Sequence, residues 1–239
     1  MEKISIVGFG RFGQVLYKLL KNDFEIIVYD TAKIKVDKNY NVVVVNTLEN
    51  VYKSDTIFYA VPIDSFEGVI SEHSKFFQKR HLLVDVLSVK MHPENVFKKY
   101  LKGTGAMAML SHPMFGPDSA ADSFNGLPIV LDQFLSNKPK FNFWKFFFKS
   151  KGLKVVEMSP KEHDKLAADS QGLTHFVGRV LDAYNMKPTS IDTLGARKLL
   201  EIRKQTCGDS WQLFSNLQHY NPYTKNMRVN LGNAYDKIY

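Results

Sequence analysis

The side chains best suited to catalysis follow two short apolar runs in the middle of the chain. Ser88 lies in the segment VDVLSVK (residues 84–90), and His112 lies in SHPMFGP (residues 111–117). A neutral imidazole can take a proton near neutral pH, and a serine hydroxyl can orient the group that gives it up. Together they suit removal of a proton from a substrate hydroxyl. Each residue alone is more often structural, as a buried hydrogen-bonded histidine or a turn serine.

A glycine-rich turn near the N-terminus is suited to a dinucleotide. It consists of Gly8, Phe9, Gly10, Arg11, Phe12 and Gly13, after an apolar run and at the start of an amphipathic stretch. Such glycines permit a tight turn and close approach of the backbone to a pyrophosphate at a helix N-terminus. Asp30 follows at the spacing of the carboxylate that binds the ribose hydroxyls. The alternative is that the glycines serve only helix packing.

The acidic residue also bears on the choice between NAD and NADP. A carboxylate at Asp30 would repel the 2′-phosphate of NADP, so the sequence favours NAD. NADP stays possible, because Lys33 and Lys35 could turn toward a 2′-phosphate. Exposed loop lysines are the simpler interpretation of both residues.

The elements that must position these residues follow from the hydrophobic pattern. Short β-branched runs alternate with amphipathic stretches over residues 1–158, which predicts an α/β domain with a Rossmann-type, doubly wound parallel sheet. The predicted strands are 4–7, 26–29, 42–45, 56–60, 82–86, 106–111, 128–131 and 154–158, and the predicted helices are 13–22, 66–77 and 140–149. The phenylalanine-rich stretch 140–149 favours a helix that covers the sheet over a membrane-binding or partner-binding face. Ser88 and His112 then lie at carboxyl ends of strands, which face the ligand crevice.

The strand pattern ends before residue 159, and a small all-helical dimerisation domain is predicted over residues 159–239. Ser159 and Pro160 are typical of an N-cap and a first helical position. We expect helices over 160–184, 193–206 and 210–220. A unit of this size buries little apolar surface alone, so a homodimer through these helices is expected.

Composition narrows the class of protein. The chain has 239 residues, with 32 Lys and Arg against 24 Asp and Glu, and its basic residues are scattered among acidic ones. This pattern favours an anionic small-molecule substrate over nucleic acid. Cys207 is the single cysteine, so we expect neither a disulfide nor a thiolate-rich metal site, and a reducing cytoplasm is the expected compartment. The sequence has no pattern of a secretory leader, a plastid transit peptide or a membrane-spanning run.

The segments around Ser88 and His112 resemble the DVxSVK and HPMFGP motifs of prephenate and arogenate dehydrogenases. The similarity continues in residues 156–158, 162–164, 167–168 and 171–175, covers nearly the whole chain, and is greatest with plant-like arogenate dehydrogenases. The resemblance implies that His112 is the general base for the ring hydroxyl and that Ser88 orients that hydroxyl. Hydride leaves the same carbon for the nicotinamide, and the ring carboxylate departs as carbon dioxide. The implied product is tyrosine or 4-hydroxyphenylpyruvate.

A polar stripe in the helical domain is a candidate substrate site. Gln171, His175 and Arg179 are spaced four residues apart among apolar neighbours, so they share one helix face. The resemblance implies that Gln171 and His175 contact the substrate side chain, and the alternative is a row of hydrogen bonds within a helix interface. Residues 162–164 also match the family, but their place in a first helical turn favours capping and dipole compensation.

Two further assignments stay open. Many microbial members bind the ring carboxylate through an arginine, which here could be Arg203, Arg179, Arg197 or Arg228. Asp209 matches an acidic position of plant-like arogenate dehydrogenases and suits the ammonium group that arogenate has and prephenate lacks. Arogenate is therefore slightly favoured. Asp209 could equally be the N-cap of the helix near residue 210.

Two other classes of protein compete with this interpretation. A β-hydroxyacid dehydrogenase shares a Rossmann domain and a helical tail, but it does not explain the two motifs together. A nicotinamide-binding redox sensor could keep the fold and lose the chemistry. Retention of Ser88, His112, Gln171 and His175 argues against that loss. Since the sequence ends at Tyr239, we expect no appended regulatory or mutase domain.

Overall fold

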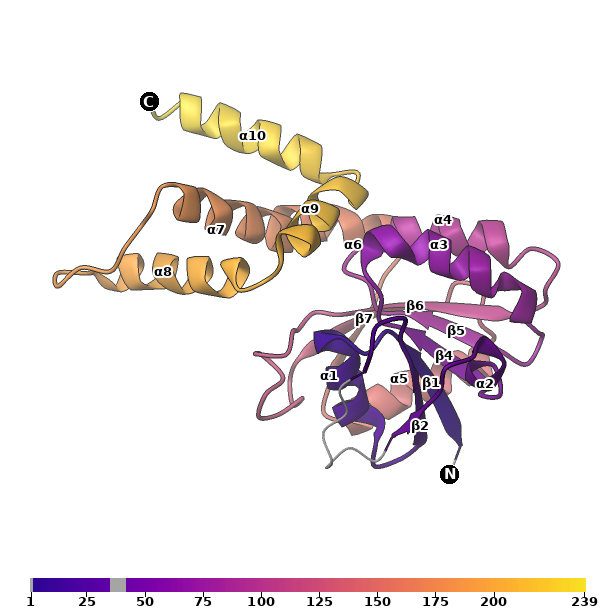
Figure 1. The fold of residues 1–239 in the computed structure, drawn as a ribbon. Helices are drawn as coiled ribbons and strands as arrows, with labels where there is room; N and C mark the ends of the chain where they lie inside the picture. Colours follow the sequence, from indigo (N-terminus) through magenta and orange to yellow (C-terminus); the bar gives the residue numbers. More distant parts are fainter. Residues whose placement is uncertain (1, 35–41) are drawn as a thin grey trace. The chain divides into compact units, whose positions relative to one another are not determined.

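The chain forms two compact units, Met1–Pro160 and Lys161–Tyr239. The computed structural model describes residues 2–34 and 42–239, and Figure 1 draws both units in the colours of the sequence. Lys35, which was suggested to turn toward the 2′-phosphate of NADP, lies outside the described residues.

An eight-stranded sheet forms the centre of the first unit, in the order β3-β2-β1-β4-β5-β6-β7-β8. The strands are β1 (Lys3–Val7), β2 (Glu25–Tyr29), β3 (Val43–Val44), β4 (Thr56–Tyr59), β5 (Leu82–Asp85), β6 (Met107–Pro113), β7 (Pro128–Asp132) and β8 (Lys154–Glu157). The strand order reverses between β1 and β4, and ligands of doubly wound sheets bind beyond the carboxyl ends of strands at such a point. The predicted Rossmann-type fold is confirmed.

One strand pair departs from the predicted parallel sheet. The first residues of β6, Met107–Met109, pair with β5 in parallel, whereas Leu110–Pro113 pair with β7 in antiparallel register. A parallel connection usually needs a helical crossover, and residues 114–127 form turns and bends without a helix. The predicted parallel sheet is therefore confirmed for most strand pairs, with β6 and β7 as an antiparallel exception. His112 sits in the antiparallel part, opposite Val130.

Helices cover both faces of the sheet (Figure 1). They are α1 (Arg11–Leu20), α2 (Leu48–Val51), α3 (Ile63–His73), α4 (Met91–Tyr100) and α5 (Lys138–Ser150). Trp144 of α5 contacts Phe58 of β4 with ring centroids 5.0 Å apart, and Phe66 of α3 contacts the next strand residue, Tyr59, at 6.0 Å. Because successive strand residues point to opposite faces, α5 and α3 lie on opposite sides of the sheet. Leu16 of α1 belongs to the same apolar cluster as Trp144.

The phenylalanine-rich helix α5 packs on the sheet, as predicted. Its residues Phe141, Trp144 and Phe148 are buried, and Phe24 stacks on Trp144 at 5.6 Å. Phe143 and Phe146 face outward and are 47% and 62% exposed. The helix begins at an N-cap, Asn137, whose side chain accepts a hydrogen bond from the Lys140 amide.

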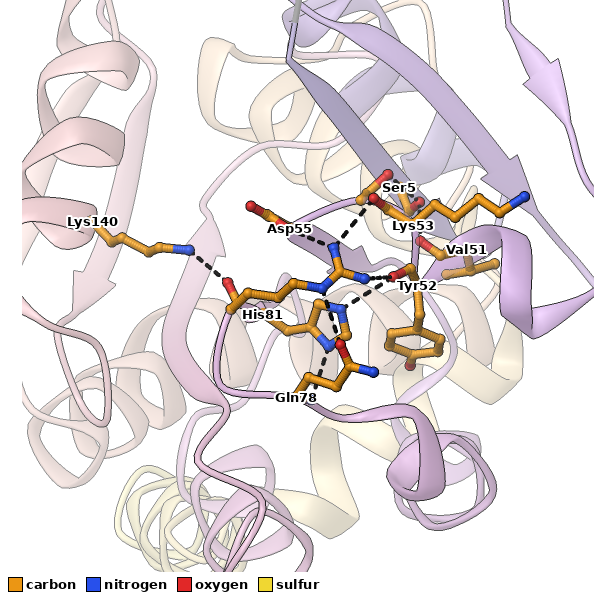
Figure 2. A network of polar contacts seen from close by, with 10 residues as sticks. Ser5, Val51, Tyr52, Lys53, Asp55, Gln78, His81 and Lys140 are labelled. Atoms are coloured by element: carbon orange, nitrogen blue, oxygen red, sulfur yellow. Dashed lines mark hydrogen bonds and ion pairs between the residues drawn. The ribbon is translucent and has the colours of Figure 1, made fainter.

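A network of polar contacts lies at the amino ends of β4 and β5 (Figure 2). The Arg80 guanidinium donates to the Asp55 carboxylate at 2.7 Å and to the Tyr52 carbonyl at 2.5 Å. His81 Nε2 lies 3.2 Å from the same carbonyl, and Lys140 of α5 donates to the Arg80 carbonyl at 2.8 Å. These bonds fix the amino ends of the strands and leave the carboxyl ends for a ligand.

The second unit is helical. It contains α6 (Pro160–Ala167), a π-helical turn η2 (Ala168–Gly172), α7 (Leu173–Ala183), α8 (Leu194–Cys207), α9 (Trp211–Tyr220) and α10 (Thr224–Asp236). The predicted helix over 160–184 therefore contains a π-turn, and α10 was missed. Helices α7 and α8 pack closely at Gly178, where a Cβ would lie 1.9 Å from Thr206 Oγ1. Within residues 2–34 and 42–239, none of the helices combines the length and apolar character needed to cross a bilayer.

Candidate active site

The glycine-rich turn between β1 and α1 is packed tightly except at one position. Gly8 has φ +90°, and a Cβ there would lie 2.4 Å from the Ala60 carbonyl oxygen. A Cβ at Gly13 would lie 2.3 Å from the Gly8 carbonyl oxygen. Gly10, by contrast, has no neighbour within 4 Å of a Cβ and precedes the first turn of α1. Open backbone over a helix N-terminus fits a pyrophosphate, so these residues fit a dinucleotide.

Asp30 secures this turn from the end of β2. Its Oδ2 accepts a hydrogen bond from the Phe9 amide at 2.7 Å, and its Oδ1 accepts one from the Ala32 amide at 2.9 Å. The carboxylate therefore lies beside the glycine turn, where a ribose would approach. Lys33 is exposed in the loop that follows.

The side chains of Arg11 and Phe12, in the glycine-rich turn, lie against the segment after His112. Arg11 forms an exposed ion pair with Asp118 at 3.5 Å, and the Phe12 ring lies 6.3 Å from the Phe115 ring. The two sequence motifs, far apart along the chain, are therefore neighbours in the fold.

Ser88 and His112 belong to adjacent strands. Ser88 follows the carboxyl end of β5, and His112 lies near the carboxyl end of β6. His112 is 2% exposed, whereas Ser88 is partly exposed. The sheet thus brings both residues to the edge that also carries the glycine turn.

A buried ion pair joins the segments of Ser88 and His112. Lys90 donates to Asp85 Oδ2 and, at 2.5 Å, to the Ser111 carbonyl. Asp85 Oδ1 accepts from the Ser111 amide at 3.1 Å, and Ser111 Oγ donates to the Asp85 carbonyl at 2.5 Å. The pair therefore spans from the end of β5 to the residue before His112. Both charged side chains are almost fully buried, at 0% and 2% exposure.

Asp85 and Lys90 belong to the sequence motif around Ser88, but the sequence analysis predicted no role for them. The signal was available, because an acid and a base five residues apart in an otherwise apolar segment have to find partners once they are buried. Burial raises the pKa of Asp85, and the Lys90 ammonium opposes that rise. The charged pair is thus held in place by the fold around it.

In the second unit, the predicted polar stripe contains buried atoms without partners. Gln171 Oε1, His175 Nδ1 and Arg179 Nε are buried and make no hydrogen bond to any described residue. Leaving such atoms unsatisfied is costly, so their retention points to a polar ligand. Burial lowers the pKa of His175, which favours its neutral form.

Arg179 is the best placed of the four candidate arginines. Its guanidinium donates to the Asp209 carbonyl at 2.7 Å and lies 5.2 Å from the Trp211 ring and 5.5 Å from the Phe214 ring. Asp209 is also close enough to His175 to oppose the fall in its pKa. Gln171, His175, Arg179 and Asp209 therefore form one cluster within the second unit.

The other three arginines, like Arg179, donate to groups of the protein itself, whereas Arg179 also has a buried Nε without a hydrogen-bond partner. Arg203 donates to Asp182 Oδ1 at 3.0 and 2.8 Å and to the Met186 carbonyl at 2.6 Å. Arg197 donates to the Asp192 carbonyl at 2.7 Å, and Arg228 donates to Gln218 Oε1 at 2.6 Å. Each of them would have to exchange these bonds for a substrate carboxylate.

The predicted helix-capping roles in the second unit can be compared with the structure. The N-cap of α9 is Ser210, whose side chain accepts from the Leu213 amide at 3.1 Å, so the alternative role of Asp209 as N-cap was wrong. Glu162 lies in the first turn of α6, as dipole compensation requires. His163 and Asp164, the next two residues, are buried and joined by a 2.7 Å contact.

The comparisons with known proteins agree with these motifs. A family model described as the nucleotide-binding domain of prephenate dehydrogenase matches residues 17–157, and one described as a TYRAAT1-like C-terminal domain matches residues 180–239. Chloroplastic arogenate dehydrogenase 2 of Arabidopsis thaliana is 33% identical over 248 residues, which cover 99% of this chain and 68% of that protein. Chloroplastic arogenate dehydrogenase 1 of the same plant is 36% identical over 230 residues, but this chain spans only 36% of its length.

A solved structure has the same fold. Prephenate dehydrogenase from A. aeolicus, in complex with hydroxyphenyl propionate and NAD+, superposes with a TM-score of 0.73 at 17% identity. The superposition covers 99% of this chain and 89% of that one. It extends the likeness over both units.

Proposed function

We propose, because the chain belongs to the prephenate dehydrogenase family, that it catalyses the oxidative decarboxylation of arogenate or prephenate. Hydride passes to NAD(P)+, and the product is tyrosine or 4-hydroxyphenylpyruvate, on the route to tyrosine. The observation that carries this proposal is the Lys90–Asp85–Ser111 link, which ties the loop of Ser88 to the strand of His112 beside the glycine turn.

His112 and Ser88 supply the proton chemistry of this reaction. His112 takes the proton of the ring hydroxyl as hydride leaves the carbon that carries it, and Ser88 orients the hydroxyl by a hydrogen bond. The bond from the ring to its carboxylate then breaks, carbon dioxide leaves, and the electron pair of that bond completes the aromatic ring, whose oxygen takes the proton back from His112. A bound nicotinamide supplies the hydride acceptor. A well-placed base of this kind contributes about a hundredfold to ten-thousandfold in rate.

The glycine turn and Asp30 hold the dinucleotide in this proposal. Gly8, Gly10 and Gly13 shape the turn, the amides at the start of α1 receive the pyrophosphate, and Asp30 accepts from the ribose hydroxyls. NAD is preferred over NADP because a 2′-phosphate would meet the Asp30 carboxylate.

The cluster in the second unit binds the anionic small-molecule substrate. Gln171 and His175 offer the unpartnered atoms for its side chain, and Arg179 is the preferred partner for a carboxylate. Arg203 stays a candidate only if it gives up Asp182. Asp209 suits the ammonium group of arogenate, which is therefore favoured over prephenate.

We also propose a homodimer that works in the cytoplasm. Several large apolar side chains of the second unit are exposed, including Tyr184 at 81%, Ile191 at 87%, Leu194 at 62% and Trp211 at 66%, and a second copy could cover them. Cys207 is a free cysteine, which suits a reducing compartment. Light scattering at about micromolar concentration tests the dimer, and a monomeric mass refutes it.

The direct test measures reduced-cofactor formation with arogenate or prephenate against NAD or NADP. Turnover in any combination establishes the reaction, and the best combination identifies cofactor and substrate. His112→Asn should reduce kcat at least a hundredfold by the usual scale of about 10² for a lost general base, while the Kd for NAD stays unchanged. His219→Asn, on an exposed position of α9, is the matched control and should behave as wild type. Activity that survives in His112→Asn would refute its role as the base.

Asp209 and Asp30 have their own variants in the same assay. Asp209→Asn should shift the ratio of specificity constants from arogenate toward prephenate, and Asp30→Asn should shift it from NAD toward NADP. An unchanged ratio in either variant contradicts the corresponding assignment. No turnover in any combination, from folded protein that binds cofactor, would favour a redox sensor or a β-hydroxyacid dehydrogenase instead.

A further inference from the structure

A widened helical turn lies directly before the substrate cluster. Residues Ala168–Gly172 form a π-helix between α6 and α7, and the Leu173 amide donates to the Ala168 carbonyl, five residues earlier. Such turns are rare and are frequently found at functional sites. Gln171 lies within this turn, and His175 lies one helical turn beyond it. The turn therefore sets the direction of both side chains relative to α6.

Side chains from α9 and α10 support the turn at its last residue. Gln218 of α9 donates through Nε2 to the Gly172 carbonyl at 2.8 Å and is itself 9% exposed. Arg228 of α10 donates to Gln218 Oε1 at 2.6 Å, which fixes the orientation of the amide. Thr224 donates to the Gln218 carbonyl at 2.7 Å. This chain of bonds leads from α10 through α9 to the widened turn.

Helices α9 and α10 also pack closely against the π-turn at Gly172. A Cβ at Gly172 would lie 3.2 Å from Thr224 Cγ2 and 3.7 Å from Leu217 Cδ2, so both helices approach the turn here. Ser170 Oγ donates to the Leu166 carbonyl at 2.7 Å, and Thr174 Oγ1 donates to the Ser170 carbonyl at 2.9 Å. Polar side chains thus donate to the Ser170 and Gly172 carbonyls within the widened segment and to the Leu166 carbonyl before it.

We propose that Gln218 and Arg228 are positioning residues, which hold the π-turn open and thereby direct Gln171 and His175 to the substrate. Each residue of an α-helix turns the chain by about 100°, so a return to regular helical spacing rotates α6 against α7 by about that angle. The face of α7 that carries His175 and Arg179 would then point in another direction relative to α6. This role rests on the proposed function, since it concerns the orientation of groups that bind the cyclohexadienyl substrate.

The test replaces the amide donor of Gln218 with a group of the same size. Gln218→Glu keeps the size of the side chain and a partner for Arg228, but it removes the amide hydrogen that Gly172 receives. We expect KM for the preferred substrate to rise about tenfold, the scale of one lost hydrogen bond, while KM for NAD stays unchanged. Gln205→Glu makes the same chemical change at an exposed position of α8 and should leave every constant at its wild-type value.

Two further measurements separate positioning from general destabilisation. Hydrogen exchange of the amides in residues 168–176 should become faster in Gln218→Glu without a change in the exchange of α8. Arg228→Leu should have the same effect on KM, and the double variant should be no worse than either single variant, because both act through one chain of bonds.

The results of these experiments distinguish failure of the proposed function from failure of the positioning role. Wild-type protein without turnover refutes the proposed function and, with it, the role toward substrate. Normal wild-type turnover with unchanged substrate KM and unchanged exchange in Gln218→Glu refutes the positioning role alone. A variant in which KM for substrate and KM for NAD rise together, with faster exchange throughout the second unit, also refutes it and leaves Gln218 as a stabilising residue.

Discussion

The buried ion pair of Lys90 and Asp85 provides the sharpest test of how the first unit holds its reacting side chains. Lys90→Met keeps the apolar stem and removes the ammonium group, so the Asp85 carboxylate stays buried without its charged partner. Removing one partner of a buried pair costs about 3–5 kcal/mol, against a total stability of about 5–15 kcal/mol for a typical domain. We expect a folded protein of low stability.

The size of this loss should depend on pH in a defined direction. Burial already raises the pKa of Asp85 above its ordinary value, and removal of Lys90 takes away the group that opposes that rise. In the variant, the folded state keeps the proton at pH values where the unfolded state has lost it. The free energy of unfolding therefore falls by about 1.4 kcal/mol per pH unit, from the unfolded pKa near pH 4 up to the folded pKa. The variant should approach wild-type stability at low pH.

Urea unfolding at several pH values between about 5 and 8 measures this effect. Trp144 is 2% exposed in the first unit, so its fluorescence reports exposure of that core. Lys99→Met is the matched control, because Lys99 pairs with Glu67 on the surface, where the two side chains are 63% and 45% exposed. A Lys90→Met variant as stable as this control, or one whose loss of stability does not change with pH, would refute the reasoning.

The double variant Asp85→Asn/Lys90→Met separates stability from position. Asparagine has one acceptor oxygen, so it can keep the bond from the Ser111 amide, which donates to Asp85 Oδ1 at 3.1 Å, and loses the bond from the Leu87 amide, which donates to Oδ2 at 3.2 Å. We expect it to recover most of the lost stability, since no unpaired charge remains buried. The Ser111 carbonyl still lacks its Lys90 donor, so kcat should stay low. A double variant with wild-type kcat would show that the link does not position His112.

Three further predictions concern single sites. Burial lowers the pKa of His73 from 6.5 to about 4, so its protonation favours the unfolded state. The stability it contributes is complete above pH 6.5 and is lost toward pH 4, about 3 kcal/mol in total, and His73→Asn should flatten this part of a urea-unfolding profile. Gly178→Ala should destabilise the protein by about 1–3 kcal/mol, because the new Cβ meets Thr206 Oγ1 at 1.9 Å; a melting temperature at or above wild type would contradict this packing. Ser210→Ala should cost about 1 kcal/mol by loss of the α9 cap to Leu213, and unchanged urea unfolding would contradict that role.

Most strands of the first unit could be predicted because they are short β-branched runs, whereas β6 was predicted from its apolar residues alone. The sequence could not predict the antiparallel pairing of β6 and β7, since it depends on which partner the long strand β6 meets along its length. Helix α10 was missed for a local reason. Residues Asn221 and Pro222 indicate a chain break, and of the helix residues only Thr224 and Met227 are buried, so no apolar stripe marks the helix.

The sequence could predict those residues of the candidate site whose type and spacing indicate a chemical role. The glycine turn, His112 and the stripe from Gln171 to Arg179 follow from residue type and spacing. Supporting groups such as Lys90 and Gln218 have no such signature, because their role lies in one hydrogen bond to a carbonyl 21 or 46 residues away. Only the fold reveals that bond.

Stability alone does not account for these supporting groups. A buried ion pair such as Asp85 with Lys90 loses solvation on both charges, and apolar residues of equal volume often stabilise a protein as well or better. The π-turn is likewise a rare departure from regular helical geometry, frequently found at functional sites. In each unit the unusual feature contacts the backbone within a few residues of a group that we assign to the reaction. Both features are therefore best understood as the means by which backbone position is fixed where an apolar contact, which has no direction, could not fix it.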